Sequence, residues 1–327
     1  SKISFFDSLV KIGHGFQEIF GVFGNVIENA FGFNAVKLED NRSKVGEHFD
    51  KIKKGLGDTK DKLDGLAKDI TSTPHADTTG VESTIKGASE VFERLIAALT
   101  TLADTAKAAG DTNIGDAATD NNAVGADENS VKAIIDSVKE IIKAAEESGV
   151  KINVGDAGNQ IAAGAANAVE SLARTGAAAA ANSGPKLAAE VSKADPWAMI
   201  DKIKDAKTST AALVQNNNNH EAGLLAGGTI ANGNNAGAKT NADLAAAVAL
   251  KAMTKGGKFA QPNGDEAVVV KAAAISAVNK VLGVLDFIIR KTVESNLEKI
   301  GEAVKGIQYL ETTTESTEAS TTQPATA

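Results

Sequence analysis

The segment DEAVVVKAAAISAVNKVLGVLDFIIRKTVESNLEKIGEAVKGIQYL, residues 265–310, decides the fold of this 327-residue chain. Its apolar residues recur at steps of three and four, which is the spacing of a stripe along one face of a helix. At about 1.5 Å of rise per residue, such a helix would be a rod of roughly 65 Å, too long to bury its own stripe. We therefore expect partner helices along most of its length. The stripe consists of Val268, Ala272, Ile275, Val278, Leu282, Leu285, Ile289, Val293, Leu297, Ile300, Val304 and Ile307.

The other end of the chain provides the expected partner, since seven of the eleven phenylalanines lie within the first 33 residues. Burying one large apolar side chain stabilises a fold by roughly 1.5–3 kcal/mol. We predict that this N-terminal helix packs antiparallel on the C-terminal rod, which would place residue 1 near residue 307. A membrane-surface helix is the alternative, but the polar side lacks the Lys and Arg enrichment of such helices. The apolar stripe comprises Phe5, Leu9, Ile12, Phe16, Phe20, Phe23, Ile27 and Ala30.

Two further seams with coiled-coil spacing follow, separated by Pro74, which ends the first of them. Thr59 fills the one polar step of the first seam. Matched seams joined by a short turn predict an antiparallel helical hairpin. The first seam contains Val45, Phe49, Ile52, Leu56, Leu63, Leu66 and Ile70, and the second contains Val81, Ile85, Ala88, Phe92, Leu95, Leu99, Leu102 and Ala106.

Shorter helices are expected between the hairpin and the rod. Ser130 is the expected N-cap of the first, which ends near Gly149, and a short strand is an open alternative at 150–154. Asp195 followed by Pro196 is typical of a helix start, and Thr240 or Asn241 is expected to cap the last. The segment 175–185 is ambiguous, because five alanines favour a helix while Gly184 and Pro185 oppose it. The expected ranges are 130–149, 161–174, 196–215 and 242–254.

Four segments rich in Asn, Asp, Gly, Thr and Ala show no period and are expected to be loops. The longest carries four consecutive asparagines, and loops of this length in a compact domain are usually functional or disordered. The expected loops are 110–129, 151–159 and 216–239, and the ambiguous segment 175–185 is the fourth if it is not helical. The patterns together predict an all-α, elongated helical bundle over residues 1–310, with its long N- and C-terminal helices packed together, extended irregular loops and at most one or two very short strands. The tail 311–327 is mostly Thr, Ser, Glu and Ala and is expected to be disordered.

Composition excludes several classes of protein. The apolar fraction is 43% and the charged fraction 23%, which is typical of a globular chain, and the net charge of −8 is spread out, so a nucleic-acid partner is not expected. There is no cysteine, hence neither a disulfide nor a thiolate metal site. Charged residues interrupt the most hydrophobic segment, so no membrane span is expected. Since the chain opens at Ser1 without a methionine or a secretory n-region, we expect a mature fragment.

No grouping of residues predicts catalysis, a cofactor or a metal. The four histidines, His14, His48, His75 and His220, are scattered at no ligand spacing. The segment 120–125 begins like a calcium loop but fails at Val124. The segment 233–240 departs from a phosphate-binding loop at Ala238 and follows no strand. Asn41-Arg42-Ser43 fits a glycosylation sequon, which is weak as a single match. We therefore expect no enzyme.

Several segments resemble the variable large proteins, which are variable major lipoproteins of relapsing-fever spirochaetes related to the VlsE surface antigen of Lyme spirochaetes. The resemblance covers essentially the whole chain, and its most specific block is AAAVALKAMTKGGKFA, residues 245–260. It is also carried by Ser4–Leu9, by the segment 16–23 and by Ala272–Arg290.

The resemblance implies an outer-membrane surface lipoprotein, one of many alternatives expressed one at a time, whose replacement lets the bacterium evade host antibodies. The four loops would then be the variable display around an invariant-type helix, 242–254. Such proteins are anchored through a lipidated N-terminal cysteine, which we expect upstream of Ser1. Diacylation would give firm anchoring.

Two alternatives stay open. The protein could instead be a host-ligand adhesin or complement-binding protein, which would require a basic or aromatic surface patch. The helix 242–254 is read as a buried element because only Asp243 and Lys251 are charged, while a binding surface for a host factor is the alternative. The sequence does not decide whether the protein associates with itself.

Overall fold

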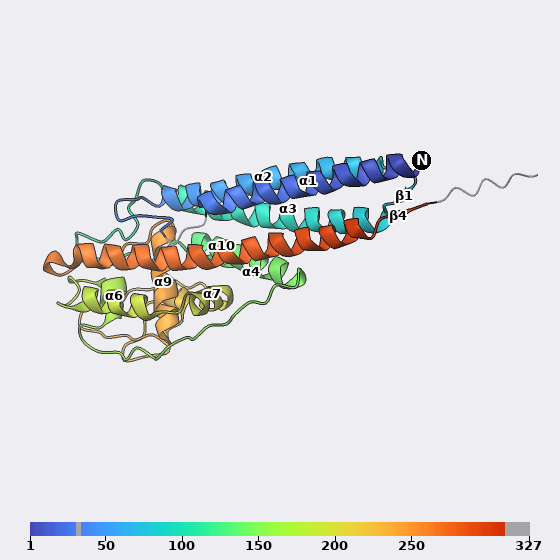
Figure 1. The fold of residues 1–327 in the computed structure, drawn as a ribbon. Coiled ribbons are helices and arrows are strands. Elements are labelled where there is room, and N and C mark those ends of the chain that lie inside the picture. The colour runs from blue at the N-terminus through green and yellow to red at the C-terminus, as the bar shows by residue number, and fades with distance from the viewer. Residues whose placement is uncertain (31–33, 311–327) are drawn as a thin grey trace, which may run out of the picture.

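The structure is a computed structural model that describes residues 1–30 and 34–310, and within it the chain forms an elongated all-α bundle (Figure 1). The predicted fold class is confirmed. The long helices are α1 (Lys2–Ala30), α2 (Ser43–Thr71), α3 (Thr79–Ala108), α4 (Glu128–Glu147) and α10 (Ala267–Lys305). The shorter helices are α5 (Ala168–Ala173), α6 (Ser183–Lys193), α7 (Pro196–Asp205), α8 (Ala222–Gly227) and α9 (Asn241–Met253), with a 3-10 turn η1 at Gly264–Glu266.

Two very short strand pairs complete the described part of the chain. Strand β1 (Ala76–Asp77) pairs antiparallel with β4 (Gln308–Tyr309), with Ala76 opposite Tyr309. Strand β2 (Arg174–Thr175) pairs in parallel with β3 (Ile230–Ala231). The first pair joins the turn of the α2–α3 hairpin to the end of α10, and the second joins two irregular segments.

Helices α2 and α3 form the predicted antiparallel hairpin (Figure 1). Every residue of both predicted seams is buried, including Thr59, whose hydroxyl donates to the Gly55 carbonyl at 2.8 Å. A buried threonine is tolerated here because a carbonyl of its own helix accepts the hydrogen bond of its hydroxyl. The seam spacing alone therefore predicted correctly which face of each helix is covered.

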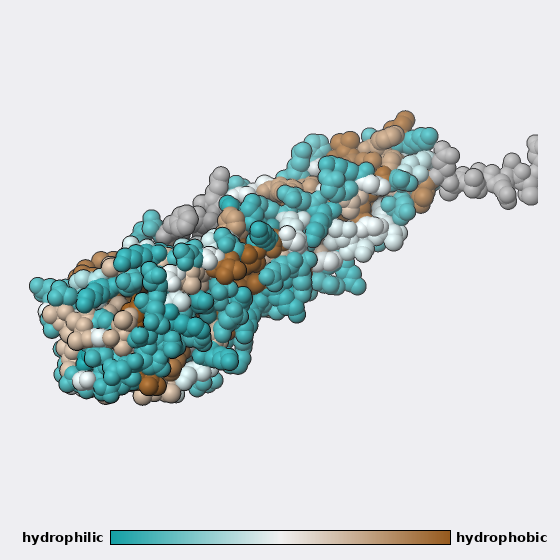
Figure 2. Space-filling model, turned by 90° about the horizontal axis from the view of Figure 1, so that it is seen from below, coloured by the Kyte–Doolittle hydropathy of each residue, from teal (hydrophilic) through white to brown (hydrophobic). Residues whose placement is uncertain are grey.

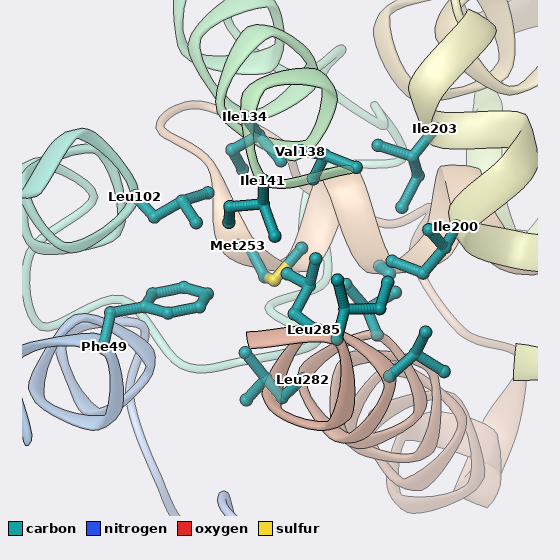
Figure 3. Close-up of a cluster of buried hydrophobic side chains, with 14 of the residues drawn as sticks. Phe49, Leu102, Ile134, Val138, Ile141, Ile200, Ile203, Met253, Leu282 and Leu285 are labelled. Atoms are coloured by element: carbon teal, nitrogen blue, oxygen red, sulfur yellow. The ribbon is translucent and has the colours of Figure 1, made fainter. Parts of the chain in front are cut away.

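Helix α10 lies at the centre of the molecule and contacts helices from both halves of the chain. In Figure 3, Leu282 and Leu285 of α10 point toward residues from several other elements. These are Phe49 of α2, Leu102 of α3, Ile134, Val138 and Ile141 of α4, Ile200 and Ile203 of α7, and Met253 of α9. The predicted stripe is correct in the middle of α10, but Val268 is 62% exposed because Val270 and Ala273 face the core there instead.

The two terminal helices pack together as predicted, and the chain ends meet. The ring of Phe5 lies 5.4 Å from that of Tyr309, and a Cβ at Gly301 of α10 would lie 3.0 Å from Phe16. Helix α2 is a second and larger partner of α1, which the sequence pattern did not indicate. The predicted stripe positions Ile27 and Ala30 lie outside the residues whose side chains are described, and the predicted tail 311–327 lies outside the described residues.

Helix α9 is buried along its whole length, including both of its charged residues, and it crosses the bundle beside α10 (Figure 1). Thr240 is its N-cap, as predicted, and accepts from the Asp243 amide at 3.1 Å. The helix is rich in alanine, which allows neighbouring helices to approach closely. The prediction that 242–254 is a buried element is confirmed.

Several helix boundaries were wrong. Helix α4 begins at Glu128 because Asp127, not Ser130, is its N-cap and accepts from the Ser130 amide. Helix α7 begins after Asp195 as predicted but ends at Asp205, ten residues early, and no strand forms at 150–154.

The alanine-rich region 161–185 also differs from the prediction. Before α6 begins at Ser183, only 168–173 is helical, because Asn167 caps this short helix and its amide also donates to the carbonyls of Ala162 and Ala236. The sequence pattern missed α6 altogether. Pro185 lies in its first turn, where proline is tolerated.

One helix of the described part, Gly264–Lys305, is long and apolar enough to cross a membrane by length and composition. More than half of its most apolar window is buried inside the protein. The contacts of α10 with α3, α4, α6, α7 and α9 are those of a core helix.

Candidate functional site: the loop end and its buried anchors

The irregular segments gather at one end of the molecule, around α6, α7 and α9, while the N-terminus and the β1–β4 pair lie at the other end (Figure 1). Figure 2 shows that the loop end is covered largely by hydrophilic residues on the face seen there. This arrangement separates the segments 110–129, 175–185 and 216–239 from the chain termini by most of the length of α10. The segment 151–159 instead starts beside the C-terminal part of α10, where the Ser148 carbonyl accepts from the Ser295 hydroxyl at 2.7 Å and from the Lys299 ammonium at 3.0 Å.

The four predicted loops differ in how much of their surface is exposed. The segment 151–160 is mostly exposed, and Val154 is 62% exposed. In 110–129, the exposed run Thr119–Asn122 lies between buried residues such as Ile114 and Ala126. In 175–185, Ala181 and Asn182 are exposed whereas Ala179 is buried.

The segment 216–239 corrects the expectation of a free loop. It contains α8 and β3, and its buried residues include His220, Leu225, Ile230 and Ala236. Glycines allow this packing: a Cβ at Gly223 would lie 2.0 Å from the Lys207 carbonyl oxygen. Its exposed residues are few and include 231–233, Asn219, Glu221 and Lys239.

Buried charged groups hold the irregular segments to the helices. The guanidinium of Arg42, which is 1% exposed, donates to the carbonyls of Thr254 and Gly257 just after α9. Burial lowers the pKa of Arg42 to about 10, while nearby Asp116 acts in the opposite direction. A side chain noted in the sequence only as part of a glycosylation sequon therefore joins the α1–α2 connection to the loop after α9.

Lys251 has a similar position within α9. Its ammonium donates to the Leu172 carbonyl of α5 at 2.7 Å and lies 5.8 Å from the centre of the Phe259 ring. The side chain is fully buried, and desolvation, together with the positive charge of Arg42, lowers the pKa of Lys251 to about 7. The hydrogen bond fixes the end of α5 against α9.

The carboxylate of Glu170 in α5 organises the neighbouring loop. It accepts from the amides of Ala166 and Ala180, both at 3.0 Å, and forms a buried ion pair of 2.5 Å with Arg174. Arg174 in turn donates to the Asn232 side chain at 3.0 Å. The ion pair itself is local to α5 and β2, but the hydrogen bonds of its two members join α5 to residue 180 and to residue 232.

Asp243 and His220 fix the segment before α9. Asp243 accepts from the Ala222 amide at 3.1 Å and from the Thr240 hydroxyl at 2.7 Å. The Nε2 atom of His220 accepts from the Val214 amide at 3.0 Å, and its Nδ1 atom lies 2.9 Å from the Gly237 carbonyl. These contacts match a neutral imidazole with its proton on Nδ1.

The chemical groups noted in the sequence are not brought together. His14 is exposed on α1, and His48 pairs with Asp286 of α10 at 2.9 Å, where burial raises the pKa of the aspartate. Within the described residues no group of three His, Asp or Glu is placed to hold a metal. The phosphate-loop-like segment 233–240 instead has a buried middle and ends as the cap of α9.

A groove of about 520 Å³ lies between α2 and α3. It is lined by solvated charged residues, and the Lys60 ammonium within it is paired with Asp64 at 3.0 Å and with Glu93 at 3.4 Å. Lys60, Asp64 and Glu93 are thus paired with one another and do not converge on a ligand.

Comparison with known proteins gives the same fold. The chain matches the sequence profile of the Borrelia lipoprotein family over residues 16–304. It is 58% identical to variable large protein 12 and 57% identical to variable large protein 14, both of Borrelia hermsii. These alignments cover 100% of this chain and 90% and 91% of the two relatives.

A solved structure agrees with the sequence relatives. The crystal structure of the Lyme disease variable surface antigen VlsE of Borrelia burgdorferi superposes with a TM-score of 0.71 at 30% identity, covering 91% of this chain and 98% of that one. The resemblance noted in the sequence is thereby confirmed, and this chain belongs to the Borrelia lipoprotein family.

Proposed function

We propose that this protein is an antigenically variable lipoprotein of the bacterial outer surface that lets the cell evade host antibody and performs no catalysis. The observation that carries the proposal is that the side chains that hold the loops in place are different from the exposed loop residues that an antibody could contact. The side chains that position the loops are buried, whereas exposed residues such as 119–122 and 231–233 belong to irregular segments that gather at the end away from the termini. Exposed loop residues tolerate exchange at little cost in stability.

The names of relatives support the same function. Two B. hermsii relatives are called variable large proteins, and the solved B. burgdorferi protein is called a variable surface antigen. An exchangeable display requires a framework that does not change when the display does, and the all-buried α9 is suited to that role. Host antibodies that bind the exposed loops are the proposed partners.

The chain termini support attachment to the outer membrane at the opposite end. Helix α1 begins beside β4, where Lys2 lies over the Tyr309 ring at 5.7 Å. A lipidated cysteine preceding residue 1 would leave the loop end as the part of the molecule farthest from the membrane. Diacylation is sufficient for firm anchoring.

Exchange of exposed loop residues is expected to remove antibody binding without loss of stability. The test variant carries substitutions at Thr119, Lys151, Val154, Gln215 and Ala231, all of which are exposed. Single surface substitutions change stability by about 0.5 kcal/mol or less, so the melting temperature should stay nearly constant. Binding of serum antibodies raised against the unsubstituted protein should fall by most of its value in a titration.

The matched control changes five exposed residues of the helical framework instead, Lys51, Asp61, Lys86, Lys139 and Glu298. It should keep both stability and serum binding. If the framework variant loses antibody binding and the loop variant keeps it, the loops are not the display. A Leu225→Ser variant, inside the segment 216–239, should melt earlier because Leu225 is buried.

A host-ligand adhesin or complement-binding protein is the second candidate, and one surface patch favours it. Phe287 is 38% exposed, packs edge-on against Trp197, and has the Arg290 guanidinium 5.5 Å and the Lys291 ammonium 5.8 Å from its ring. Both cations also face Glu294, which weakens the patch as an anion site. A pull-down from host plasma with the intact chain that recovers no specific protein would remove this candidate.

A further inference from the structure

Helix α1 has two apolar faces, and only one of them is covered. Phe5, Ile12, Ile19 and Phe23 are buried in the core. A second set lies on the adjacent face, with Ile3 74%, Phe6 58%, Val10 60% and Phe20 37% exposed. Figure 2 shows hydrophobic residues exposed at this end of the molecule, near the grey tail. We call the set Ile3, Phe6, Val10 and Phe20 the outer stripe.

The outer stripe has the period of a coiled-coil seam. Residues 3, 6, 10, 13, 17, 20 and 24 follow one another at alternating steps of three and four. In heptad terms, Ile3, Val10 and Gln17 fall at a positions, and Phe6, Gly13 and Phe20 at d positions. Such a seam normally faces a second helix, and within residues 1–30 and 34–310 these four apolar side chains remain 37–74% exposed.

We propose that the outer stripe pairs with the outer stripe of a second copy of this chain, the two α1 helices running parallel. The choice of residues favours this occupant. β-Branched residues at a positions with leucine at d favour parallel two-stranded coiled coils. Here Ile3 and Val10 meet the first condition, while phenylalanines occupy two of the d positions. A single polar residue at an a position, here Gln17, fixes the register of a pair at some cost in stability.

Charge supports the parallel orientation. Lys2 and Asp7 occupy the g and e positions that flank the first heptad of the outer stripe. In a parallel pair, the g residue of one helix lies beside the following e residue of the other, so each Lys2 would meet an Asp7 of opposite charge. The Lys2 ammonium, now over the Tyr309 ring, is on an exposed side chain that can reach either position.

Glycines allow the two helices to approach closely. A Cβ added at Gly13 or Gly24 would meet nothing within 4 Å, so the space in front of both positions is open. Gly13 and Gly24 occupy the fourth and seventh positions of this seam. The flanking side chains of the other copy can fill the gap that a glycine leaves.

Other occupants fit less well. A membrane-surface helix is enriched in Lys and Arg on its polar side, whereas the polar side of α1 mixes Lys2 and Lys11 with Asp7 and Glu18. The tail 311–327 has no apolar side chain larger than those of Ala and Pro, so its composition does not complement the stripe.

The absence of cysteine allows a direct test of the pairing. Val10→Cys places the only thiol on the outer stripe, and the neighbouring Lys11→Cys places it on an exposed site off the stripe. Under mild oxidation, Val10→Cys should form the disulfide-linked dimer at least about tenfold faster than Lys11→Cys, since cross-linking requires the two thiols to meet. Thermal unfolding of both reduced variants checks that each is folded. Equal rates would overturn the proposal.

Two further measurements separate the remaining arrangements. An equimolar mixture of Ile3→Cys and Phe20→Cys should give mainly linked dimers of like with like, and a majority of mixed dimers would show antiparallel pairing and contradict the proposal. Without cysteine, Val10→Asp should weaken concentration-dependent dimerisation in sedimentation by at least about tenfold. If the unsubstituted chain instead stays monomeric and binds phosphatidylcholine or phosphatidylglycerol vesicles through the stripe, the occupant is lipid and the proposal fails. None of these results depends on antibody binding.

Discussion

Replacing Gly125 with alanine is expected to lower the free energy of unfolding by about 3 kcal/mol or more, which is at the upper end for an overpacked site. A Cβ at this position would lie 1.9 Å from the carbonyl oxygen of Gly227, a backbone atom that cannot rotate away. The segment that contains Gly125 is held against the end of α8 by the hydrogen bond from the Ala126 amide to the Ala226 carbonyl at 3.0 Å. Denaturant unfolding followed by circular dichroism measures the loss.

Gly164→Ala is the matched control for this prediction. Gly164 also lies in an irregular segment, but a Cβ there would meet nothing within 4 Å. Its free energy of unfolding should change by about 0.5 kcal/mol or less. If the two variants were equally stable, the segment 110–129 would not be fixed against α8 as the structure shows.

The second large effect is a change in how stability depends on pH. Lys251 has a pKa of about 7 in the folded protein and an ordinary value of 10.5 when exposed. Between these values the unfolded chain binds more protons than the folded one, so stability rises with pH. The folded state bears the full cost of burying the charge below about pH 7 and is relieved of it as the pH rises. Stability should therefore increase by about 2 kcal/mol between pH 7 and 9.

A Lys251→Met variant should lose this increase, because it has no amine to titrate. The control is Lys239→Met, which removes a half-exposed lysine paired with Glu221 at 2.6 Å. The pKa of Lys239 is raised by that partner, so it stays charged in both states over this range and its removal leaves the slope unchanged. Urea unfolding at pH 7, 8 and 9 gives the slopes. If the free energy of unfolding of Lys251→Met rises with pH as steeply as that of the unsubstituted protein, burial does not lower the pKa of Lys251 in the folded state.

The helical framework could be predicted from the sequence because its period is local. The seam from Val45 to Ile70 and the seam from Val81 to Ala106 each run over eight positions, and all their residues are buried. The fully buried helix α9 could be recognised because only Asp243 and Lys251 interrupt its apolar residues. For long regular elements the spacing alone identifies the covered face.

The loop end could not be predicted because long-range contacts determine it. The segment 161–167 has a helical composition, yet the amide of Asn167 bonds to Ala236 on a distant segment. Nothing near Arg42 in the sequence indicates that its partners are the carbonyls after α9. In the Asn-rich segment, the apolar residues Leu225 and Ile230 could have indicated that this part of the chain is buried. The small polar residues around them leave no regular apolar spacing from which burial could be predicted.

The burial of α9 beneath the exposed loops is the central claim, and amide hydrogen exchange across the intact protein tests it most directly. Amides of 241–253 should exchange at rates close to that of global unfolding, together with the middle of α10, while those of 151–160 exchange fastest within the loop end. If the amides of 241–253 exchange as rapidly as those of 151–160, this helix is not the fixed support of the loops and the account is wrong.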